Sequence, residues 1–257
     1  MNPDNKYIVE VDNLTKKFGD FIAVNQISFK VKKGEIFGFL GANGAGKTTA
    51  MRMLTGLLEP TTGKAIVAGY DVKKQPEKVK FNIGYMSQKF SLYDDLRVNE
   101  NIRFYAGIYG LKPSEIRIKT NELLEELGME NLRKKLVGDL PLGWKQKLAF
   151  AIAMVHDPPV VFLDEPTSGV DPITRRQFWE MIYKASSEGT TIFVTTHYLD
   201  EAEYCTRASI MVDGMIKALD TPENLKKTFN SKNMQDVFVQ LARGEKTDIK
   251  KNKEKEL

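Results

Sequence analysis

The sequence has almost no cysteine and no long hydrophobic run. Cys205 is the only cysteine among 257 residues, so no internal disulfide can form, as is typical of proteins from a reducing compartment. No segment approaches the roughly 18 consecutive apolar residues that a membrane-spanning helix needs. The first residues, 1–7, contain no apolar stretch of the kind found in a secretory signal. We therefore expect a cytoplasmic protein that reaches a membrane only by docking.

The sequence also lacks a strong excess of one charge. Its formal net charge is +4, with 28% charged and 42% hydrophobic residues, which is ordinary for a globular protein. This mildly basic balance is not typical of a dedicated nucleic-acid binder, so we expect no nucleic-acid partner. Lysines crowd the C-terminus, and we predict a single folded domain over residues 1–230 followed by a short charged tail over residues 231–257.

Apolar segments of strand length alternate with helical stretches along the chain. Glu35–Leu40, Val160–Leu163 and Thr191–Thr195 are predicted strands. The middle of the chain is helical, with one predicted helix that begins at Pro113 and ends at Gly128. Alternation of this kind predicts an α/β fold with a mostly parallel sheet and helices on both faces.

A glycine-rich loop follows the strand Glu35–Leu40. It reads Gly-Ala-Asn-Gly-Ala-Gly-Lys-Thr from Gly41 and fits the phosphate-loop pattern G-x-x-x-x-G-K-[ST] between a strand and a helix. Glycines allow backbone N–H groups to surround phosphate oxygens, and the helix N-terminus adds partial positive charge. Lys47 is expected to reach the β- and γ-phosphates, and Thr48 to offer its hydroxyl to Mg²⁺. The predicted nucleotide-binding residues here are Gly41, Asn43, Gly44, Ala45, Gly46, Lys47, Thr48 and Thr49.

Two carboxylates and a histidine follow the later strands. Asp164 and Glu165 end the strand Val160–Leu163, and His197 follows Thr191–Thr195. Ligands of open α/β sheets bind where parallel strands end at their carboxyl side. We expect Asp164 to hold Mg²⁺, Glu165 to orient or deprotonate the attacking water, and His197 to contact the γ-phosphate. On their own, two acids after a strand could equally begin a loop, and a lone histidine is often structural.

The order of these motifs resembles that of the ATP-binding cassette (ABC) family. The series spans roughly residues 7–229. The resemblance implies a phosphate-loop, RecA-like core with an N-terminal antiparallel β subdomain and an inserted helical subdomain. The core would comprise 1–90 and 155–230, and the helical subdomain 91–154. The motifs that carry the resemblance are the phosphate loop, Gln88 after a strand, Leu140-Pro-Leu-Gly-Trp-Lys-Gln146, Asp164-Glu-Pro-Thr-Ser-Gly-Val-Asp171 and Thr196-His197.

The resemblance also implies partners and further site residues. ATP and Mg²⁺ would be the cofactors, and two cassettes, identical or different, would face head to tail. Phe18 is similar to the aromatic residue that stacks on adenine, although it could equally be a core aromatic residue. Gln88 would contact Mg²⁺ and the attacking water, and Asp171 would lie on the loop that crosses the dimer interface. The signature residues that would act on the partner's ATP are Leu140, Pro141, Leu142, Gly143 and Gln146.

A membrane-spanning permease subunit would be the other partner. The segment Tyr93–Leu111 of the helical lobe would receive a short helix from it, which implies a location on the inner face of the cell membrane. The aromatic side chains offered for this contact are Phe90, Tyr93, Phe104 and Tyr109, and each could instead belong to the lobe's core.

The signature segment departs from the family's usual Leu-Ser-Gly-Gly. Pro141 stands in place of the serine and Leu142 in place of the first glycine, so a hydroxyl and a close backbone approach are lost. We predict a weaker grip on the γ-phosphate across the dimer than in a consensus cassette. The segment His197–Glu203 and the signature are similar to cassettes of multidrug, daunorubicin-resistance and lipid export.

Three functions are compatible with these residues. The first is an ATPase in which ATP-driven dimer closure drives export through a separate membrane subunit. The second is a regulatory subunit that hydrolyses little ATP, which the unusual signature favours and the complete set of Gln88, Glu165 and His197 opposes. The third is a cassette that acts on DNA or the ribosome, which a single phosphate loop without heptads or a cysteine cluster opposes.

Overall fold

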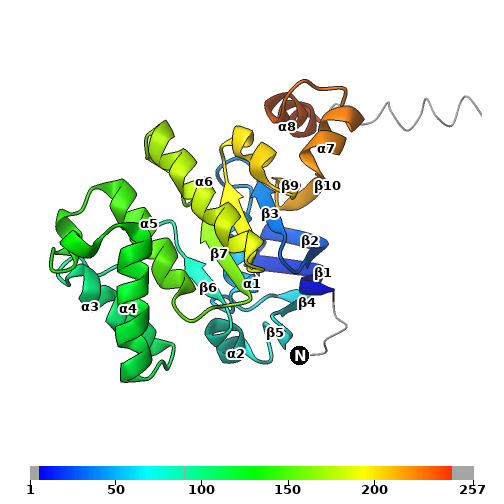
Figure 1. The fold of residues 1–257 in the computed structure, drawn as a ribbon. Helices are drawn as coiled ribbons and strands as arrows, with labels where there is room; N and C mark the ends of the chain where they lie inside the picture. The colour runs from blue at the N-terminus through cyan, green and yellow to red at the C-terminus, as the bar shows by residue number, and fades with distance from the viewer. Residues whose placement is uncertain (1–5, 90, 245–257) are drawn as a thin grey trace, which may run out of the picture.

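A six-stranded sheet forms the centre of the computed structural model, which describes residues 6–89 and 91–244 (Figure 1). The strand order is β10-β9-β3-β8-β7-β6, and every neighbouring pair is parallel except β9 with β10. All residues of β3, β7 and β8 are buried, as expected for a parallel sheet covered on both faces. The strands are β3 (Ile36–Leu40), β6 (Gly84–Met86), β7 (Val160–Asp164), β8 (Thr191–Thr196), β9 (Arg207–Val212) and β10 (Met215–Asp220).

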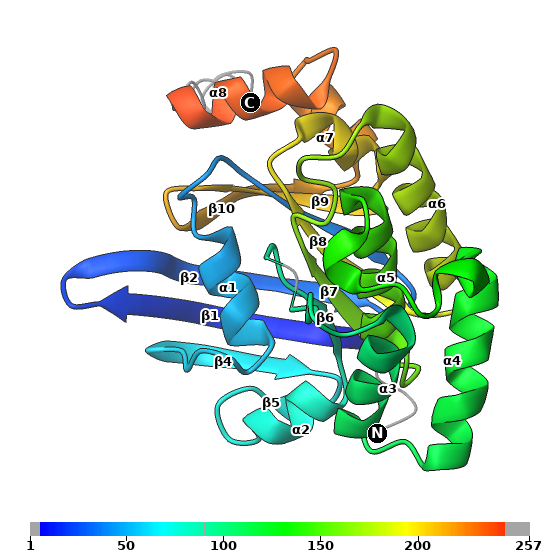
Figure 2. The same ribbon diagram turned by 90° about the vertical axis from the view of Figure 1, so that its left-hand side faces the viewer.

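A second, antiparallel sheet packs beside the first in the order β2-β1-β4-β5 (Figure 2). Helix α1 (Lys47–Leu54) contacts β2 and β4 of this sheet and β7 of the central sheet, so it lies between the two. The sheets share one aromatic core, in which the rings of Phe29 and Phe37 stack with centroids 5.4 Å apart. The predicted β subdomain is therefore confirmed. Its strands are β1 (Tyr7–Phe18), β2 (Phe21–Lys32), β4 (Thr62–Val67) and β5 (Tyr70–Asp71).

The helical insert forms a separate lobe with its own apolar core. Leu148 and Ile152 of α5 belong to this core, while Ala149 and Phe150 of the same helix pack against the central sheet. Because α5 is apolar on both sides, it joins the lobe to the rest of the domain. The short helix α2 (Pro76–Phe81) precedes β6. The lobe contains α3 (Val98–Ile108), α4 (Pro113–Leu127), the 3-10 turns η1 (Glu130–Leu132) and η2 (Val137–Asp139), and α5 (Leu142–Met154).

Contacts at the base of the lobe connect it to the core. The ring of His156 stacks on Tyr109 with centroids 3.6 Å apart, and His156 Nε2 lies 3.2 Å from the carbonyl oxygen of Ile83. Burial lowers the pKa of His156 to about 4, so the stacked ring is neutral at physiological pH. Lys184 of α6 also forms a 2.5 Å ion pair with Glu126 of α4.

The C-terminal helices correct one prediction from the sequence. The sequence predicted a tail from residue 231, but α8 (Met234–Arg243) packs on the core through Met234, Val237 and Leu241. Asn233 caps the helix by accepting a hydrogen bond from the Asp236 N–H, so the segment has its own start signal. The other elements of this part are α6 (Pro172–Ser187), η3 (Leu199–Tyr204) and α7 (Pro222–Thr228).

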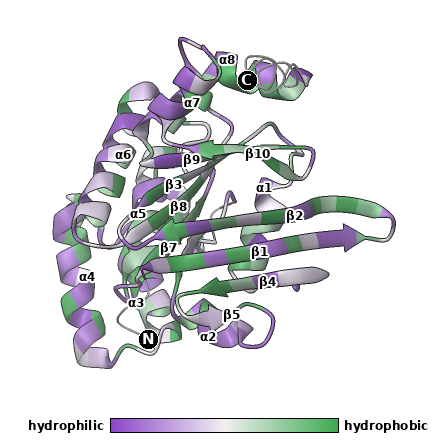
Figure 3. Cartoon of the chain, turned by 90° about the vertical axis from the view of Figure 1, so that its right-hand side faces the viewer, coloured by the Kyte–Doolittle hydropathy of each residue, from purple (hydrophilic) through white to green (hydrophobic). Residues whose placement is uncertain are grey.

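Hydrophobic residues concentrate in the central strands, and the outer helix α4 carries many hydrophilic ones (Figure 3). Across residues 6–89 and 91–244, no helix combines the length and the apolar character needed to cross a bilayer. Phe90, one of the aromatic residues proposed to contact a permease, lies outside the described residues.

Replacing Val237 with alanine tests whether α8 is part of the folded domain. Val237 is fully buried, so Val237→Ala should lower the free energy of unfolding by about 1–3 kcal/mol. Gln235→Ala, an exposed change on the same helix, serves as the control and should change little. Urea denaturation followed by circular dichroism measures both. Equal midpoints for Val237→Ala and the parent protein would show that the helix contributes nothing to the core.

Candidate nucleotide-binding site

The phosphate loop connects the buried strand β3 to α1. Gly46 has φ +101°, and a Cβ placed there would lie 2.4 Å from the carbonyl oxygen of Ala23. A Cβ on Gly41 would lie 2.5 Å from the carbonyl oxygen of Met211. Both positions therefore require glycine, because the loop is pressed against β2 and β9. Gly44 also has positive φ, but its Cβ direction is open.

Lys47 begins α1 and turns its side chain back over the loop. Its Nζ donates hydrogen bonds to the carbonyl oxygens of Gly41, at 2.8 Å, and Ala42, at 3.1 Å. It also lies 3.6 Å from Glu165 Oε1, with both side chains buried. Burial lowers the pKa of Lys47, and the neighbouring Glu165 carboxylate opposes that shift. The ammonium group is thus held at the loop in a poorly solvated position.

Asp164 is the last residue of β7 and Glu165 follows it, and β8 lies between β7 and the strand that leads to the phosphate loop. Asp164 Oδ1 accepts hydrogen bonds from Thr195 Oγ1 at 2.6 Å and from Thr48 Oγ1 at 3.5 Å. Burial raises the pKa of Asp164, while the hydrogen bond from Thr195 counteracts this. The structure therefore brings the two predicted Mg²⁺ ligands Thr48 and Asp164 together from residues 116 positions apart.

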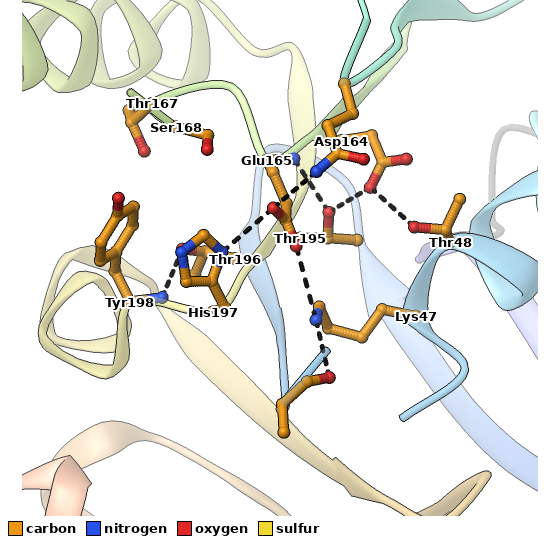
Figure 4. Close-up of polar contacts among 12 residues, drawn as sticks. Lys47, Thr48, Asp164, Glu165, Thr167, Ser168, Thr195, Thr196, His197 and Tyr198 are labelled. Carbon is orange, nitrogen blue, oxygen red and sulfur yellow. Dashed lines mark hydrogen bonds and ion pairs between the residues drawn. The ribbon is translucent and has the colours of Figure 1, made fainter. Parts of the chain in front are cut away.

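At Glu165, the segments that follow β6, β7 and β8 meet the start of α1 (Figure 4). Its Oε2 accepts a 3.0 Å hydrogen bond from Gln88 Nε2 and lies 3.0 Å from His197 Nδ1, while Oε1 faces Lys47. Its backbone has φ +49°, which is uncommon for a residue with a side chain and costs of order 1 kcal/mol. Of the three predicted catalytic residues, Glu165 therefore contacts both Gln88 and His197.

A cavity of about 470 Å³ opens above the phosphate loop, a size within the range of small-molecule and cofactor sites. Phe21 lines this cavity, but Phe18, the residue predicted to stack on adenine, does not. The two rings are paired residues at the end of the β1–β2 hairpin, and both are exposed. Phe21 is therefore an aromatic candidate that was not predicted from the sequence, although it stands only three residues after Phe18. The cavity is lined by Phe21, Ala23, Asn43, Gly44, Gly46, Lys47, Thr48, Thr49, Gln88 and Glu165.

The donor set fits magnesium bound together with a nucleotide. In the described part of the chain, no cluster of three or more His, Cys, Asp or Glu side chains could hold a metal by itself. Thr48, Asp164 and Gln88 offer a hydroxyl, a carboxylate and an amide, and Mg²⁺ prefers such oxygen ligands supplemented by phosphate and water. The remaining coordination positions would come from the ligand rather than from protein.

The signature segment lines a second cavity of about 340 Å³ that shares no residue with the first. Pro141 occupies the N-cap position of α5 without a side-chain hydrogen bond, and Leu142 is 42% exposed. A Cβ on Gly143 would lie 2.6 Å from Thr174 Cγ2, so this glycine is needed where α5 crosses α6. The lining is Pro141, Leu142, Gly143, Trp144, Lys147, Gly169, Val170, Asp171, Thr174 and Gln177.

The predicted interface residue Asp171 lies beside the signature segment. Its carboxylate accepts hydrogen bonds from the backbone N–H groups of Ile173 and Thr174 and from Thr174 Oγ1, so it caps α6. Gln146 of the signature helix donates to the carbonyl oxygen of Ser168 at 3.2 Å. Leu140, the first residue of the segment, directly follows η2. One chain therefore presents a phosphate loop and a signature segment on separate surfaces.

The phosphate loop follows the buried strand β3, and the two carboxylates stand at the end of β7, with β8 between these strands. This arrangement defines a phosphate-loop nucleotide-binding domain. The model of the family described as ABC transporter matches residues 24–168. YbhF of Escherichia coli (strain K12), a probable multidrug ABC transporter ATP-binding protein, is 47% identical over 239 residues, which cover 91% of this chain and 41% of YbhF. The chain thus spans about two fifths of that relative's length.

In two further comparisons, the match covers most of the length of the related protein. The linearmycin resistance ATP-binding protein LnrL of Bacillus subtilis (strain 168) is 35% identical over 236 residues, which cover 91% of this chain and 75% of LnrL. A dimeric ATP-binding cassette solved in a post-hydrolysis state with ADP and Pi is 25% identical, with a TM-score of 0.75, and the match covers 83% of this chain and 98% of that one. The chain belongs to the ABC transporter family and carries its nucleotide-binding cassette.

Two residues for which the sequence predicted no role support the site. Thr195 donates to Asp164, and its Oγ1 also accepts a 3.0 Å hydrogen bond from the Glu165 N–H. Glu201 is fully buried and accepts from Thr167. The pairing of Asp164 with Thr195 depends on the register of β7 with β8, which no local pattern in the sequence specifies.

The opposite pKa shifts of two aspartates predict opposite effects on stability. Because burial raises the pKa of Asp164 in the folded state, stability is lost as pH rises from the unfolded-state pKa through the folded-state pKa. Near neutral pH, Asp164→Asn should therefore raise the free energy of unfolding by roughly 1–3 kcal/mol. The gain should shrink as the pH is lowered. Thermal unfolding of the nucleotide-free protein across a pH series measures it.

Asp171→Asn provides the matched comparison. Hydrogen bonds from the Thr174 hydroxyl and then from backbone N–H groups lower the pKa of Asp171, so its charge stabilises the fold at neutral pH and this contribution is lost as the pH falls through the lowered pKa. This change should lower stability slightly. A loss of stability in Asp164→Asn equal to that in Asp171→Asn would contradict the account of Asp164 as a destabilised buried charge.

Proposed function

We propose that this chain is the ATP-binding and ATP-hydrolysing subunit of an ABC exporter, in which ATP-driven closure of two cassettes drives a separate membrane subunit. One observation carries the proposal: the Glu165 carboxylate contacts Lys47, Gln88 and His197 directly above the phosphate loop. A nucleotide-binding domain that only held ATP would need the loop, but not a buried carboxylate with these three partners.

The phosphate loop and Lys47 would bind the triphosphate. The backbone amides of the loop would surround the β-phosphate. The Lys47 ammonium, which donates to the carbonyl oxygens of Gly41 and Ala42, would instead contact phosphate oxygens. Thr48 and Asp164 would hold Mg²⁺, with Gln88 as a further ligand. Bound there, the ion would neutralise negative charge on the phosphates. A ring of the hairpin, Phe18 or Phe21, would stack on the adenine.

Glu165 would act on the water that attacks the γ-phosphate. Its carboxylate is buried and fixed by Gln88 and His197, so it is held for accepting a proton or orienting the water. The His197 side chain is 30% exposed, and its Nδ1 lies against Glu165. The other ring nitrogen, Nε2, would contact the γ-phosphate. Fixed geometry and local charge would supply the catalysis, as in other phosphoryl transfers.

A second cassette would complete each site. The phosphate loop and the signature segment of this chain line different cavities, so a head-to-tail pair could place each signature segment opposite the other's ATP. The dimeric form of the related cassette bound to ADP and Pi supports this arrangement. The second cassette is either another copy of this chain or a different cassette, and Asp171 would lie at the contact.

A permease subunit would dock on the groove between the lobe and the core. This groove is predominantly apolar and has a volume of about 310 Å³. It includes Phe81, Ile108 and Tyr109, while the exposed rings of Tyr93 and Phe104 lie edge to face with centroids 5.0 Å apart. Docking there would keep the cassette on the cytoplasmic face of the membrane. The names of YbhF and LnrL support export of a multidrug or antibiotic type of substrate.

A weakly hydrolysing regulatory role has less support. Its basis is the signature, in which Pro141 and Leu142 offer no hydroxyl and no bare backbone. The hydrolytic residues are all present and in contact, so we expect turnover. Residues 6–89 and 91–244 contain one phosphate loop and provide no observation in favour of a role on DNA or the ribosome.

Removing the Glu165 carboxylate tests hydrolysis directly. The parent protein should bind ATP in a magnesium-dependent way and release phosphate. Glu165→Gln keeps the hydrogen-bonding shape but loses the base, so kcat should fall by about 10²-fold or more. ATP should then accumulate in a stable dimer. Phosphate release and size-exclusion chromatography with ATP measure the two effects.

Lys47→Ala is the control for binding. It should abolish ATP affinity and prevent dimer formation in the same assays, because the loop loses its only side-chain cation. If the parent protein shows no magnesium-dependent ATP binding, or if Glu165→Gln hydrolyses ATP at the parent rate, the proposed function is wrong.

The unusual signature predicts a gain of function on reversion. Pro141→Ser with Leu142→Gly restores a hydroxyl and removes an exposed side chain at the start of α5. In the Glu165→Gln background, this double change should tighten ATP-driven dimerisation by about tenfold, the value of one additional charge-assisted hydrogen bond. Leu142→Ala alone serves as the control for lost bulk. Unchanged dimerisation and unchanged turnover would argue against a weakened grip.

A further inference from the structure

A second buried polar cluster lies beside the loop that follows Glu165. Glu201 of η3 is fully buried, and its Oε1 accepts a 2.6 Å hydrogen bond from Thr167 Oγ1. Thr167 is also buried and stands two residues after Glu165, on the loop that leads to Asp171 (Figure 4). The hydrogen bond therefore joins the segment after His197 to the loop after the proposed catalytic carboxylate.

Arg175 extends this cluster to α6 and back to His197. Its Nε lies 3.7 Å from Glu201 Oε1, and its guanidinium carbon lies 4.1 Å from the centroid of the Tyr198 ring. The Tyr198 ring in turn lies 4.2 Å, centroid to centroid, from His197. Arg175 sits four residues after Asp171, which caps the same helix. One set of contacts thus links His197, Glu201, Thr167 and the start of α6.

Stability alone does not account for these groups. Glu201 Oε2 and Arg175 Nε are buried and form no hydrogen bond with any residue the structure describes. A buried ion pair adds little net stability compared with well-packed apolar side chains, and an unsatisfied buried polar atom is unfavourable. Unsatisfied buried groups of this kind therefore call for an explanation other than stability.

The loop between Glu165 and α6 is held from two sides. Thr167 is bonded to Glu201, and the carbonyl oxygen of Ser168 accepts from Gln146 of the signature helix. The loop begins at the left-handed backbone of Glu165 and ends at the cap residue Asp171. A shift of Thr167 would therefore change both the direction of the Glu165 carboxylate and the surface that Asp171 presents.

We propose that Glu201 and Arg175 form a positioning pair that holds the Thr167–Asp171 loop in register with His197, so that the two are correctly placed together during turnover. Neither residue lines the cavity above the phosphate loop, and the pair acts through Thr167 and Tyr198. The inference rests on the proposed ATPase function and assigns a further set of residues to the same site.

Thr167 offers the sharpest test because two substitutions of similar size differ in one hydroxyl. Thr167→Val removes the donor to Glu201, and Thr167→Ser keeps it. Thr167→Val should lower kcat by about tenfold or more, because small misplacements of catalytic groups are costly, while the KM for ATP stays within about twofold of the parent. Thr167→Ser should retain most of the parent kcat.

Glu201→Gln tests the partner side of the same contact. It keeps the shape but removes the charge that faces Arg175, and it should reduce kcat in the same way. Combined with Thr167→Val, it should cost less than the product of the two single effects, since both act on one contact. Arg176→Gln, on the exposed neighbour of Arg175, is the matched control and should leave kcat unchanged.

The readouts separate positioning from general stability and from the proposed function. A selective fall in kcat in Thr167→Val and Glu201→Gln, with retained ATP affinity and rescue by Thr167→Ser, supports the inference. Parent-like kcat in both variants overturns it, and so does a matching fall in ATP affinity and unfolding temperature in both variants. A parent protein without ATPase activity would instead refute the proposed function, which is measured first.

Discussion

The structure depends on the burial of Lys47 and Glu165 in contact with each other at the ends of parallel strands. An isolated buried charge is very unfavourable, so each group needs a partner or a ligand. Lys47 has the loop carbonyls and Glu165, and Glu165 also has Gln88 and His197. A triphosphate would take over the role of these partners on the lysine, which explains how the same site can be stable without a ligand and still bind an anion.

The sheet order makes this arrangement possible. Because β8 lies between β3 and β7, the phosphate loop and the carboxylates stand at the ends of strands that are two strand spacings apart, roughly 10 Å. This separation leaves room for a phosphate group between them. Thr195 at the end of β8 fills the middle position and bonds to Asp164. Helix α1 is fixed between two sheets, and this rigid support keeps Lys47 and Thr48 in place.

Local patterns predicted the phosphate loop, the carboxylates and the α/β fold, because each depends on residues near one another in the chain. Helix α8 was missed, since its apolar positions Met234, Val237 and Leu241 are few and stand beside a lysine-rich end. The cavity is lined by Phe21 rather than Phe18 for another reason: the two residues form a cross-strand pair at the end of a hairpin, and only the folded hairpin determines which ring borders the cavity.

The chemical groups of the site can be recognised in the sequence alone: a glycine loop ending in Lys47, the acids Asp164 and Glu165, and the altered signature at Pro141 are local features. Which of these groups meet depends on the three-dimensional packing of the chain. Strand register joined Asp164 to Thr195, and chain crossing brought Thr167 to Glu201. Contacts of this kind link residues more than 30 positions apart, and they follow from the packing of whole elements rather than from any nearby pattern.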